Sequence, residues 1–319
     1  MVPPHKERKT KKTMKMSVSK INNKKISKRL QLKKDLSAWM WLMPALIAIY
    51  LMIWRPTVMG GVYSFFKMKG YTPQEFIGFQ NYIEVIKDTE FIPTLLNTVQ
   101  YVVLSLVIGF LPPLILAIMI NELVHFKNGF KLITYLPSIL PGIAVSLMWY
   151  YMYSPDTSGL LNSLLGLFGI EPYGWLSDER FTILYIVISM TWCGMAGSML
   201  FYFSCLQGIN TELYEAALID GAGIFSRLMH VTLPQLSGVL LLNFINQIIG
   251  IFQIMEQPMT MTGGGPNNAS TTVGYQIFKY GFVSGRAGHA MALSVIMFFI
   301  LIIFTAFYFK LEKKASENL

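Results

Sequence analysis

Charge and catalytic motifs are both scarce in this sequence. Only 13% of its 319 residues are charged, which is about half of the roughly 25% found in soluble domains. It contains no Gly-Lys dipeptide, and therefore no Gly-x-x-x-x-Gly-Lys-Ser/Thr loop for a nucleotide phosphate. It also lacks His-Glu-x-x-His, Cys-x-x-Cys and Gly-x-Ser-x-Gly, and its four histidines are scattered. We therefore expect that the chain is not an enzyme and binds no metal or cofactor itself.

Cysteine is nearly absent, with only Cys193 and Cys205 in the chain. On one predicted helix they would lie roughly 18 Å apart, at about 1.5 Å per residue. That separation is too large for a disulfide. We expect both to be small apolar residues of the core.

Hydrophobic residues make up 53% of the chain and form long runs. A transmembrane helix needs about 20 predominantly apolar residues. Tryptophan and tyrosine cluster near the ends of the runs, as they do at membrane interfaces. The sequence thus predicts an all-α integral membrane protein whose transmembrane domain covers residues 37–319. Its six predicted spans are residues 38–63, 95–120, 132–153, 181–206, 233–255 and 290–309.

The basic residues are unevenly distributed along the chain, whose net charge is +9. Thirteen of the 26 lysines and arginines precede Leu36, in a segment without aromatic residues. We expect residues 1–36 to be a basic cytoplasmic tail that faces lipid and not nucleic acid. With the N-terminus inside, 19 basic residues lie inside and seven outside, as the positive-inside rule requires. Both termini and the loop of residues 207–231 are then predicted to be cytoplasmic.

Ionisable residues are rare within the predicted spans. Glu256 and Arg55 lie near span ends, where we expect their side chains to reach the interface. Ion-coupled transporters usually bury carboxylates within their spans. An uncharged pathway for a neutral polyhydroxylated solute is therefore the better prediction. Prolines within the spans predict kinks, and they are Pro44, Pro56, Pro112, Pro113, Pro137 and Pro141.

Amide side chains form a stripe about 120° wide on the fifth predicted span, at about 100° per residue. Two interpretations stay open: hydrogen bonds between helices, or contacts with sugar hydroxyls, since amides both donate and accept. Trp192 and Phe252 would add apolar or stacking faces to this path, and small residues around Gly194 would let helices approach closely. The stripe consists of Asn243, Asn246, Gln247, Gly250, Gln253 and Gln257.

A short charged segment separates the fourth and fifth spans. Its pattern predicts an amphipathic helix that begins near Leu213 and ends at Gly221, a residue that can adopt positive φ. The string Glu215-Ala216-Ala217, with Gly221 six positions after the glutamate and Val231-Thr232-Leu233-Pro234 downstream, resembles the Glu-Ala-Ala signature of ABC importer permease subunits.

The resemblance extends beyond this loop to the maltose-type, carbohydrate branch of the binding-protein-dependent permeases. Tyr214 to Ala222 is similar to the sugar-transport form of the signature. Residues 76–82, residues 159–175 and the Thr-Gly-Gly-Gly-Pro string of residues 262–266 are similar to their external segments. Together these similarities cover about residues 37–310.

The resemblance implies a type I ABC importer permease fold with a cytoplasmic coupling helix between spans four and five. It implies four kinds of partner: a second homologous permease subunit, two ATPase subunits, an extracellular solute-binding protein and membrane lipid. ATP and Mg²⁺ would bind in the ATPases, and the location would be the bacterial cytoplasmic membrane. The residues implied to couple to the ATPase are Glu215, Ala216, Ala217, Asp220, Gly221, Leu233 and Pro234.

Three functions are compatible with the sequence to different degrees. An importer permease for a sugar, of the oligosaccharide class, fits the amide stripe and the glycine-rich segment best. An importer permease for another solute shares the Glu-Ala-Ala loop. A membrane-embedded enzyme of envelope polysaccharide synthesis would need a cluster of carboxylates or histidines at a membrane face, which the sequence lacks.

Overall fold

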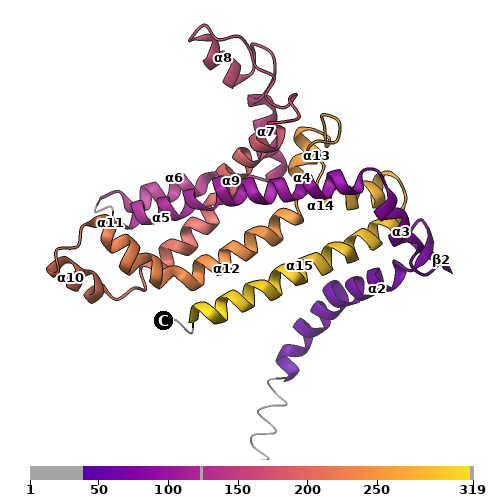
Figure 1. The fold of residues 1–319 in the computed structure, drawn as a ribbon, viewed down its shortest axis with the longest axis horizontal. Helices are drawn as coiled ribbons and strands as arrows, with labels where there is room; N and C mark the ends of the chain where they lie inside the picture. The colour runs from indigo at the N-terminus through magenta and orange to yellow at the C-terminus, as the bar shows by residue number, and fades with distance from the viewer. Residues whose placement is uncertain (1–38, 123–124, 317–319) are drawn as a thin grey trace, which may run out of the picture. The chain divides into compact units, whose positions relative to one another are not determined.

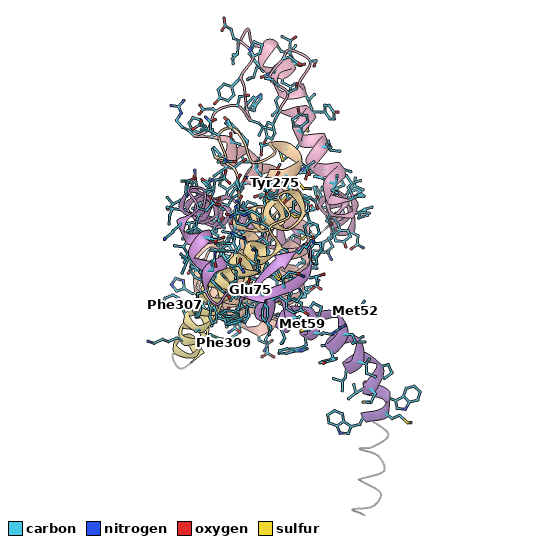
Figure 2. All side chains as sticks on the ribbon, turned by 90° about the vertical axis from the view of Figure 1, so that its right-hand side faces the viewer. Met52, Met59, Glu75, Tyr275, Phe307 and Phe309 are labelled. Carbon is cyan, nitrogen blue, oxygen red and sulfur yellow. The ribbon has the colours of Figure 1, made fainter. Side chains whose placement is uncertain are left out.

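The computed structural model describes residues 39–122 and 125–316. The expected basic tail, residues 1–36, lies outside this range. The chain divides into two units, residues up to Gly60 and residues from Gly61 onward. The first unit is helical from Trp39. Its side chains are largely exposed, as Figure 2 shows for Met52 and Met59, which are 79% and 37% exposed.

Helices dominate the described chain (Figure 1). Five continuous helices are long and apolar enough to cross a membrane: Trp39–Tyr63, Phe91–Glu122, Thr182–Leu206, Ile224–Phe252 and Ala287–Lys310. In chain order the elements are η1 (Tyr50–Trp54), α2 (Arg55–Tyr63), β1 (Phe66–Lys69), β2 (Thr72–Phe76), α3 (Gln80–Lys87), α4 (Phe91–Leu104), η2 (Ser105–Gly109), α5 (Leu111–Glu122), α6 (Lys127–Ile139), α7 (Gly142–Met152), α8 (Leu160–Gly166), α9 (Thr182–Leu206), α10 (Thr211–Ile219), α11 (Ile224–Arg227), η3 (Leu228–Thr232), α12 (Leu233–Phe252), α13 (Glu256–Met261), α14 (Val273–Phe278), η4 (Lys279–Val283) and α15 (Ala287–Ser316).

The third predicted span is not one helix, which corrects the expectation for residues 132–153. It consists of α6 and α7, which meet at an angle of 93°. Proline has no N–H for the helical ladder, and it pushes the residue before it toward extended backbone. Leu140, directly before Pro141, is indeed extended, with φ −72° and ψ 143°. The Leu140–Pro141 step therefore breaks the span, whereas α6 continues through Pro137. If the bent pair is counted as one span, it is the sixth candidate crossing.

Three π-helical segments precede prolines within the long helices. Segment η1 ends two residues before Pro56, η2 ends three residues before Pro112, and η3 ends two residues before Pro234. A proline ring clashes with the carbonyl four residues earlier. A π turn, which pairs residues five apart, locally replaces the α-helical pattern there. The helices therefore continue through these prolines where α6 and α7 do not.

One departure from the expected all-α class is a small antiparallel hairpin formed by β1 and β2. Phe66 pairs with Phe76 across it, and their rings meet edge to face at 5.4 Å. Cross-strand aromatic pairs of this kind stabilise short hairpins. Gly70, at φ +58°, lies in the turn. The hairpin and α3 lie between the first two predicted spans.

The core consists of buried apolar side chains along α9 and its neighbours. At one end, Tyr101, Ile186 and Phe252 are at most 1% exposed and belong to one cluster. Toward α10, Met199 and Leu236 belong to a second cluster. Other apolar side chains face outward, as Figure 2 shows for Phe307 and Phe309 on α15, 60% and 61% exposed. Apolar side chains both in the core and on the outer surface are expected of a helix bundle in a membrane.

Candidate functional site

A cavity of about 420 Å³ lies between α9 and α12 and is closed on a further side by η2 and α5. Its volume falls within the roughly 300–1,000 Å³ range typical of small-molecule sites. Four residues of the predicted stripe line it: Asn243, Asn246, Gln247 and Gly250. Gly194 lines it from α9. The structure thus brings five of the predicted pathway residues together around one space.

The amides in this cavity differ in their hydrogen bonding. Gln247 Nε2 donates to the Ser105 carbonyl at 2.6 Å, which joins α12 to η2. Asn243 Nδ2 is buried and has no hydrogen-bond partner among the residues that the structure describes. Asn246 is exposed to the cavity side. Gln247 therefore fits the interhelical interpretation, while Asn243 contributes a buried amide nitrogen to the cavity wall, beside the side chain of Tyr202.

Gly109 makes room for this polar wall. A Cβ at this position would lie 3.0 Å from Gln247 Nε2 and 3.1 Å from Thr191 Oγ1. Both distances are shorter than ordinary van der Waals contact. The absence of a side chain at Gly109 therefore lets Gln247 reach the Ser105 carbonyl.

Four predicted pathway residues lie elsewhere, two of them, Gln253 and Gln257, because α12 ends at Phe252, earlier than the expected residue 255. Phe252 is 1% exposed and packs in the core. Gln253 is the exposed C-cap of α12, and Gln257 belongs to α13, beside a different, smaller cavity. Trp192 contacts Trp149 edge to face at 5.9 Å and does not line the larger cavity.

The sequence interpretation missed several polar residues that line the larger cavity. Thr191, Ser198 and Tyr202 share one face of α9 with Gly194, at helical spacings of three and four residues. That spacing was a usable signal. Ser105 and Gly109 contribute from η2, where the π turn changes the helical period and obscures the pattern.

The loop after α9 has the helix that its sequence predicts. Asn210 caps α10 by accepting from the Glu212 N–H at 3.1 Å. At the other end, Gly221 has φ +79°. The Ala222 N–H donates to the Ala217 carbonyl at 2.9 Å and the Gly221 N–H donates to the Leu218 carbonyl at 3.0 Å. These two bonds form a Schellman motif, which explains the requirement for glycine.

Helix α10 presents an exposed face and forms a side-chain bond with the last residue of η3, directly before α12. Glu215 and Ala216 are exposed, Ala217 is half-buried, and Asp220 is the C-cap. Ile219 is 87% exposed, which is unusual for so large an apolar side chain. Tyr214 Oη lies 3.0 Å from Thr232 Oγ1, directly before Leu233 and Pro234 at the start of α12.

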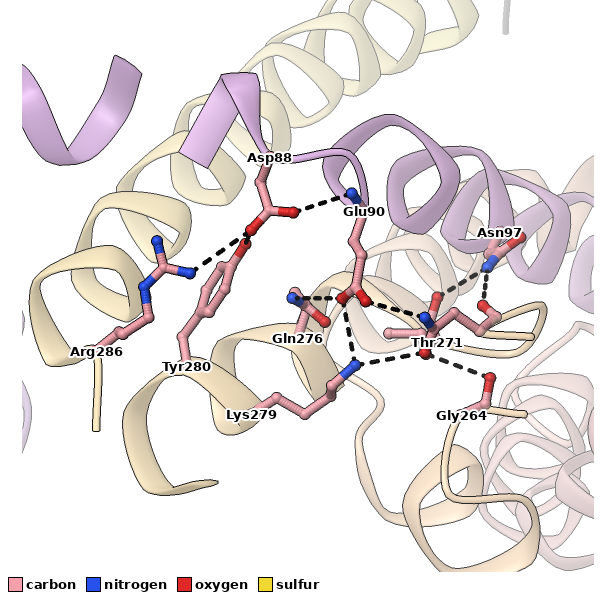
Figure 3. Close-up of polar contacts among 10 residues, drawn as sticks. Asp88, Glu90, Asn97, Gly264, Thr271, Gln276, Lys279, Tyr280 and Arg286 are labelled. Carbon is pink, nitrogen blue, oxygen red and sulfur yellow. Dashed lines mark hydrogen bonds and ion pairs between the residues drawn. The ribbon is translucent and has the colours of Figure 1, made fainter. Parts of the chain in front are cut away.

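A polar network lies at the end of the bundle where α3, α14 and the start of α15 meet (Figure 3). Glu90 accepts from Asn268 Nδ2 at 3.0 Å, from Gln276 Nε2 at 3.2 Å and from Lys279 Nζ at 3.4 Å. Asn97 Nδ2 donates to the carbonyls of Asn268 and Thr271. Glu90 and Asn97 therefore hold the glycine-rich segment against α4.

Asp88 joins the same region to α15. It accepts from Tyr280 Oη at 2.6 Å and lies 3.8 Å from Arg286 Nη1. Partial burial raises the pKa of Asp88, but the bonds from the Tyr280 hydroxyl and the Glu90 N–H outweigh it, so the net pKa is lowered. Burial and the neighbouring Asp88 raise the pKa of Tyr280 to about 12. In the described part of the chain, no group of three or more His, Cys, Asp or Glu is arranged to hold a metal.

A bundle of apolar helices around a cavity that has amide and hydroxyl groups in a largely apolar wall has the architecture of a solute permease. Residues 100–317 match the family described as binding-protein-dependent transport system inner membrane component. The chain belongs to this family, which confirms the membership predicted from the Glu-Ala-Ala loop.

Two curated relatives support the assignment. The chain is 30% identical over 285 residues to YurN of Bacillus subtilis, a probable ABC transporter permease protein, covering 88% of this chain and 97% of that protein. It is 31% identical over 288 residues to LacF of Rhizobium radiobacter, a lactose transport system permease protein, covering 88% and 96%.

The fold is that of a solved transporter. A crystal structure of a bacterial ABC transporter involved in the import of the acidic polysaccharide alginate matches with a TM-score of 0.80 and 22% sequence identity. The match covers 89% of this chain and 97% of that chain. The chain therefore has the type I ABC permease fold.

Proposed function

We propose that this chain is the pore-forming permease subunit of an ATP-driven importer that moves a sugar, of the oligosaccharide class, across a bacterial cytoplasmic membrane. The observation that carries the proposal is the polar cavity between α9 and α12, with the unpartnered Asn243 Nδ2 in its wall. A buried polar group without a partner costs about 1–3 kcal/mol. A sugar hydroxyl can accept from this amide and so remove that cost.

The sugar class draws further support from the relatives, since one is a lactose permease and the matching transporter imports a polysaccharide. The cavity lining also includes apolar groups such as Phe110, Met190 and Ile251 beside the amides. Such a mixture suits the apolar faces and hydroxyl edges of a neutral sugar.

The proposed assembly contains a second permease subunit, two ATPase subunits and an extracellular solute-binding protein. The family description, with its dependence on a binding protein, supports the last of these. The exposed face of α10, with Glu215 and apolar Ile219, supports docking of an ATPase there. In this arrangement α10 is the coupling helix, both termini are cytoplasmic, and ATP and Mg²⁺ bind in the ATPases.

The test is uptake by the assembled transporter in proteoliposomes with its binding protein and ATP, for a panel of labelled disaccharides and oligosaccharides. We expect ATP-dependent uptake of at least one sugar. Asn243→Leu should lower that uptake about tenfold, the loss expected for one buried hydrogen bond. The matched control is Gln74→Leu, at an exposed amide on the hairpin strand β2.

Two results would contradict the proposal. One is uptake of a non-sugar solute with no sugar transported, which would favour the second function considered above. The other is sugar uptake that Asn243→Leu leaves unchanged at normal protein levels.

A further inference from the structure

A second cavity, of about 230 Å³, lies between α7, α9 and α13. Its lining includes Ser146 and Trp149 from α7, Met190, Cys193 and Gly194 from α9, and Gln257 from α13. Gln257 lines this cavity and not the larger one, beside which the predicted stripe would have placed it.

Two buried polar atoms, one in the lining of this cavity and one directly behind its Gly142 wall, have no hydrogen-bond partner within the described residues. They are Trp149 Nε1, a donor, and Glu256 Oε1, an acceptor. Glu256 begins α13 and lies against the cavity wall at Gly142, where an added Cβ would overlap Oε1. The start of α13 places this carboxylate against Gly142 at the start of α7.

The two cavities are neighbours along α9. Met190 and Gly194 line both of them. A Cβ at Gly194 would meet no atom within 4 Å, so the backbone leaves open space at the boundary. The smaller volume alone falls below the roughly 300–1,000 Å³ of typical ligand sites. It is therefore suited to part of a ligand whose remainder occupies the larger cavity.

We propose that the smaller cavity is a second sugar subsite, and that one oligosaccharide extends past Gly194 from one cavity into the other. In this subsite a sugar oxygen accepts from Trp149 Nε1 in the cavity lining, and a sugar hydroxyl that reaches Gly142 donates to Glu256 Oε1 behind it. The inference rests on the proposed function and adds a carboxylate to a pathway that the sequence predicted to be uncharged. A solute with several hydroxyl groups satisfies both orphaned atoms, whereas an apolar one satisfies neither.

The first test separates binding from turnover in proteoliposomes that contain the complete transporter. We expect Trp149→Phe and Glu256→Gln each to raise the KM for uptake of the transported sugar about tenfold, with the maximal rate nearly unchanged. The matched controls are Trp41→Phe, on the exposed first helix, and Glu75→Gln, on the exposed hairpin. A purely structural role would instead lower the maximal rate or the amount of assembled protein.

The second test uses the native thiol in the cavity wall. Cys193 lines the smaller cavity, whereas Cys205 packs beside a different core cluster and lines neither cavity. N-ethylmaleimide labelling of each cysteine is followed by mass spectrometry, with and without a saturating concentration of the transported sugar. We expect the sugar to slow labelling of Cys193 about tenfold, while labelling of Cys205 stays constant.

The outcomes distinguish this inference from the function on which it rests. If the unmodified transporter moves a sugar but that sugar does not protect Cys193, or if both variants keep the normal KM, the second subsite is wrong and the proposed function stands. If no sugar in the panel is taken up at all, the proposed function itself is wrong.

Discussion

Gly109 is the residue on which the geometry of the larger cavity's amide wall depends. We expect Gly109→Ala to push against Gln247 and Thr191, because the new Cβ would lie 3.0 and 3.1 Å from their polar atoms. The Gln247 bond to the Ser105 carbonyl should weaken, at a cost of about 1 kcal/mol. The measurements are the thermal midpoint of the purified transporter and its sugar uptake.

The control for this prediction is Gly238→Ala. A Cβ there would meet no atom within 4 Å, and the position is exposed on α12. Alanine in a helix is favoured over glycine by up to about 1 kcal/mol, so this variant should be neutral or slightly stabilised. Equal losses in the two variants would show that the space at Gly109 does not matter.

For single residues, the sequence predicted which side chains share a helix face, but not where the helix ends. Asn243, Asn246 and Gln247 lie together because the helical period alone sets their relative angles. Gln257 lies elsewhere because α12 ends at Phe252 and Gln253 caps it, a boundary that the apolar pattern does not mark. The unpartnered state of Asn243 Nδ2 depends on side chains of other helices and could not be read from the chain.

Helix α10 depends on the left-handed backbone at Gly221. A side chain at φ +79° costs about 1–2 kcal/mol. We therefore expect Gly221→Val to distort the C-terminal end of α10 and to lower the amount of sugar moved per ATP hydrolysed by the assembled transporter. Glu215→Lys should do the same by reversing the charge on the exposed face of α10.

Gly223→Val is the matched control, because Gly223 has φ −69° and open space around its Cα. It should couple normally. Normal coupling in the Gly221 and Glu215 variants as well would remove α10 from the proposed coupling path.

The contacts of Asp88, at the end of α3, with Tyr280 of η4 and with Arg286 directly before α15 should depend on pH. The pKa of Asp88 is lowered in the folded protein, so its stabilising contribution is present above its ordinary value of 3.8. That contribution is lost as the pH falls through the lower pKa of the folded state. We expect the thermal midpoint to fall less steeply on acidification in Asp88→Asn than in the unmodified transporter. The exposed-site variant Glu75→Gln should follow the unmodified curve, and identical slopes in all three proteins would contradict the assignment.

Among the elements, the long apolar helices were predictable and the short irregular ones were not. The 20-residue rule locates the spans because lipid requires continuous apolar helix. The sequence predicted kinks at six prolines, but within the described spans only the Leu140–Pro141 step breaks a helix, and π turns precede Pro56 and Pro112. The hairpin was missed because its two strands have only four and five residues.

The whole chain is expected to depend on its partners for activity. It contains no phosphate-binding loop, so the chain alone in proteoliposomes should neither hydrolyse ATP nor take up sugar. We expect both activities once the second permease, the ATPase subunits and the solute-binding protein are added. ATP hydrolysis by the purified chain alone would contradict this prediction.

For the whole chain, the family was predictable from one loop, because the spacing from Glu215 to Pro234 is specific to these permeases. The convergence of α7, α9 and α13 around a second cavity was not, since it depends on the 93° break between α6 and α7 and on the early end of α12.

The π turn of η3 lies between α10 and α12, and it sets the direction in which the side chains of α12 point. It lies between Tyr214, which contacts Thr232, and the amides that begin at Asn243. One residue of an α-helix corresponds to about 100° of rotation. Removing a single residue from η3 would therefore turn Asn243, Asn246 and Gln247 by about that angle, away from the cavity, without altering any of them. The chemistry of the pathway is thus fixed by the count of residues between two sites as much as by their identity.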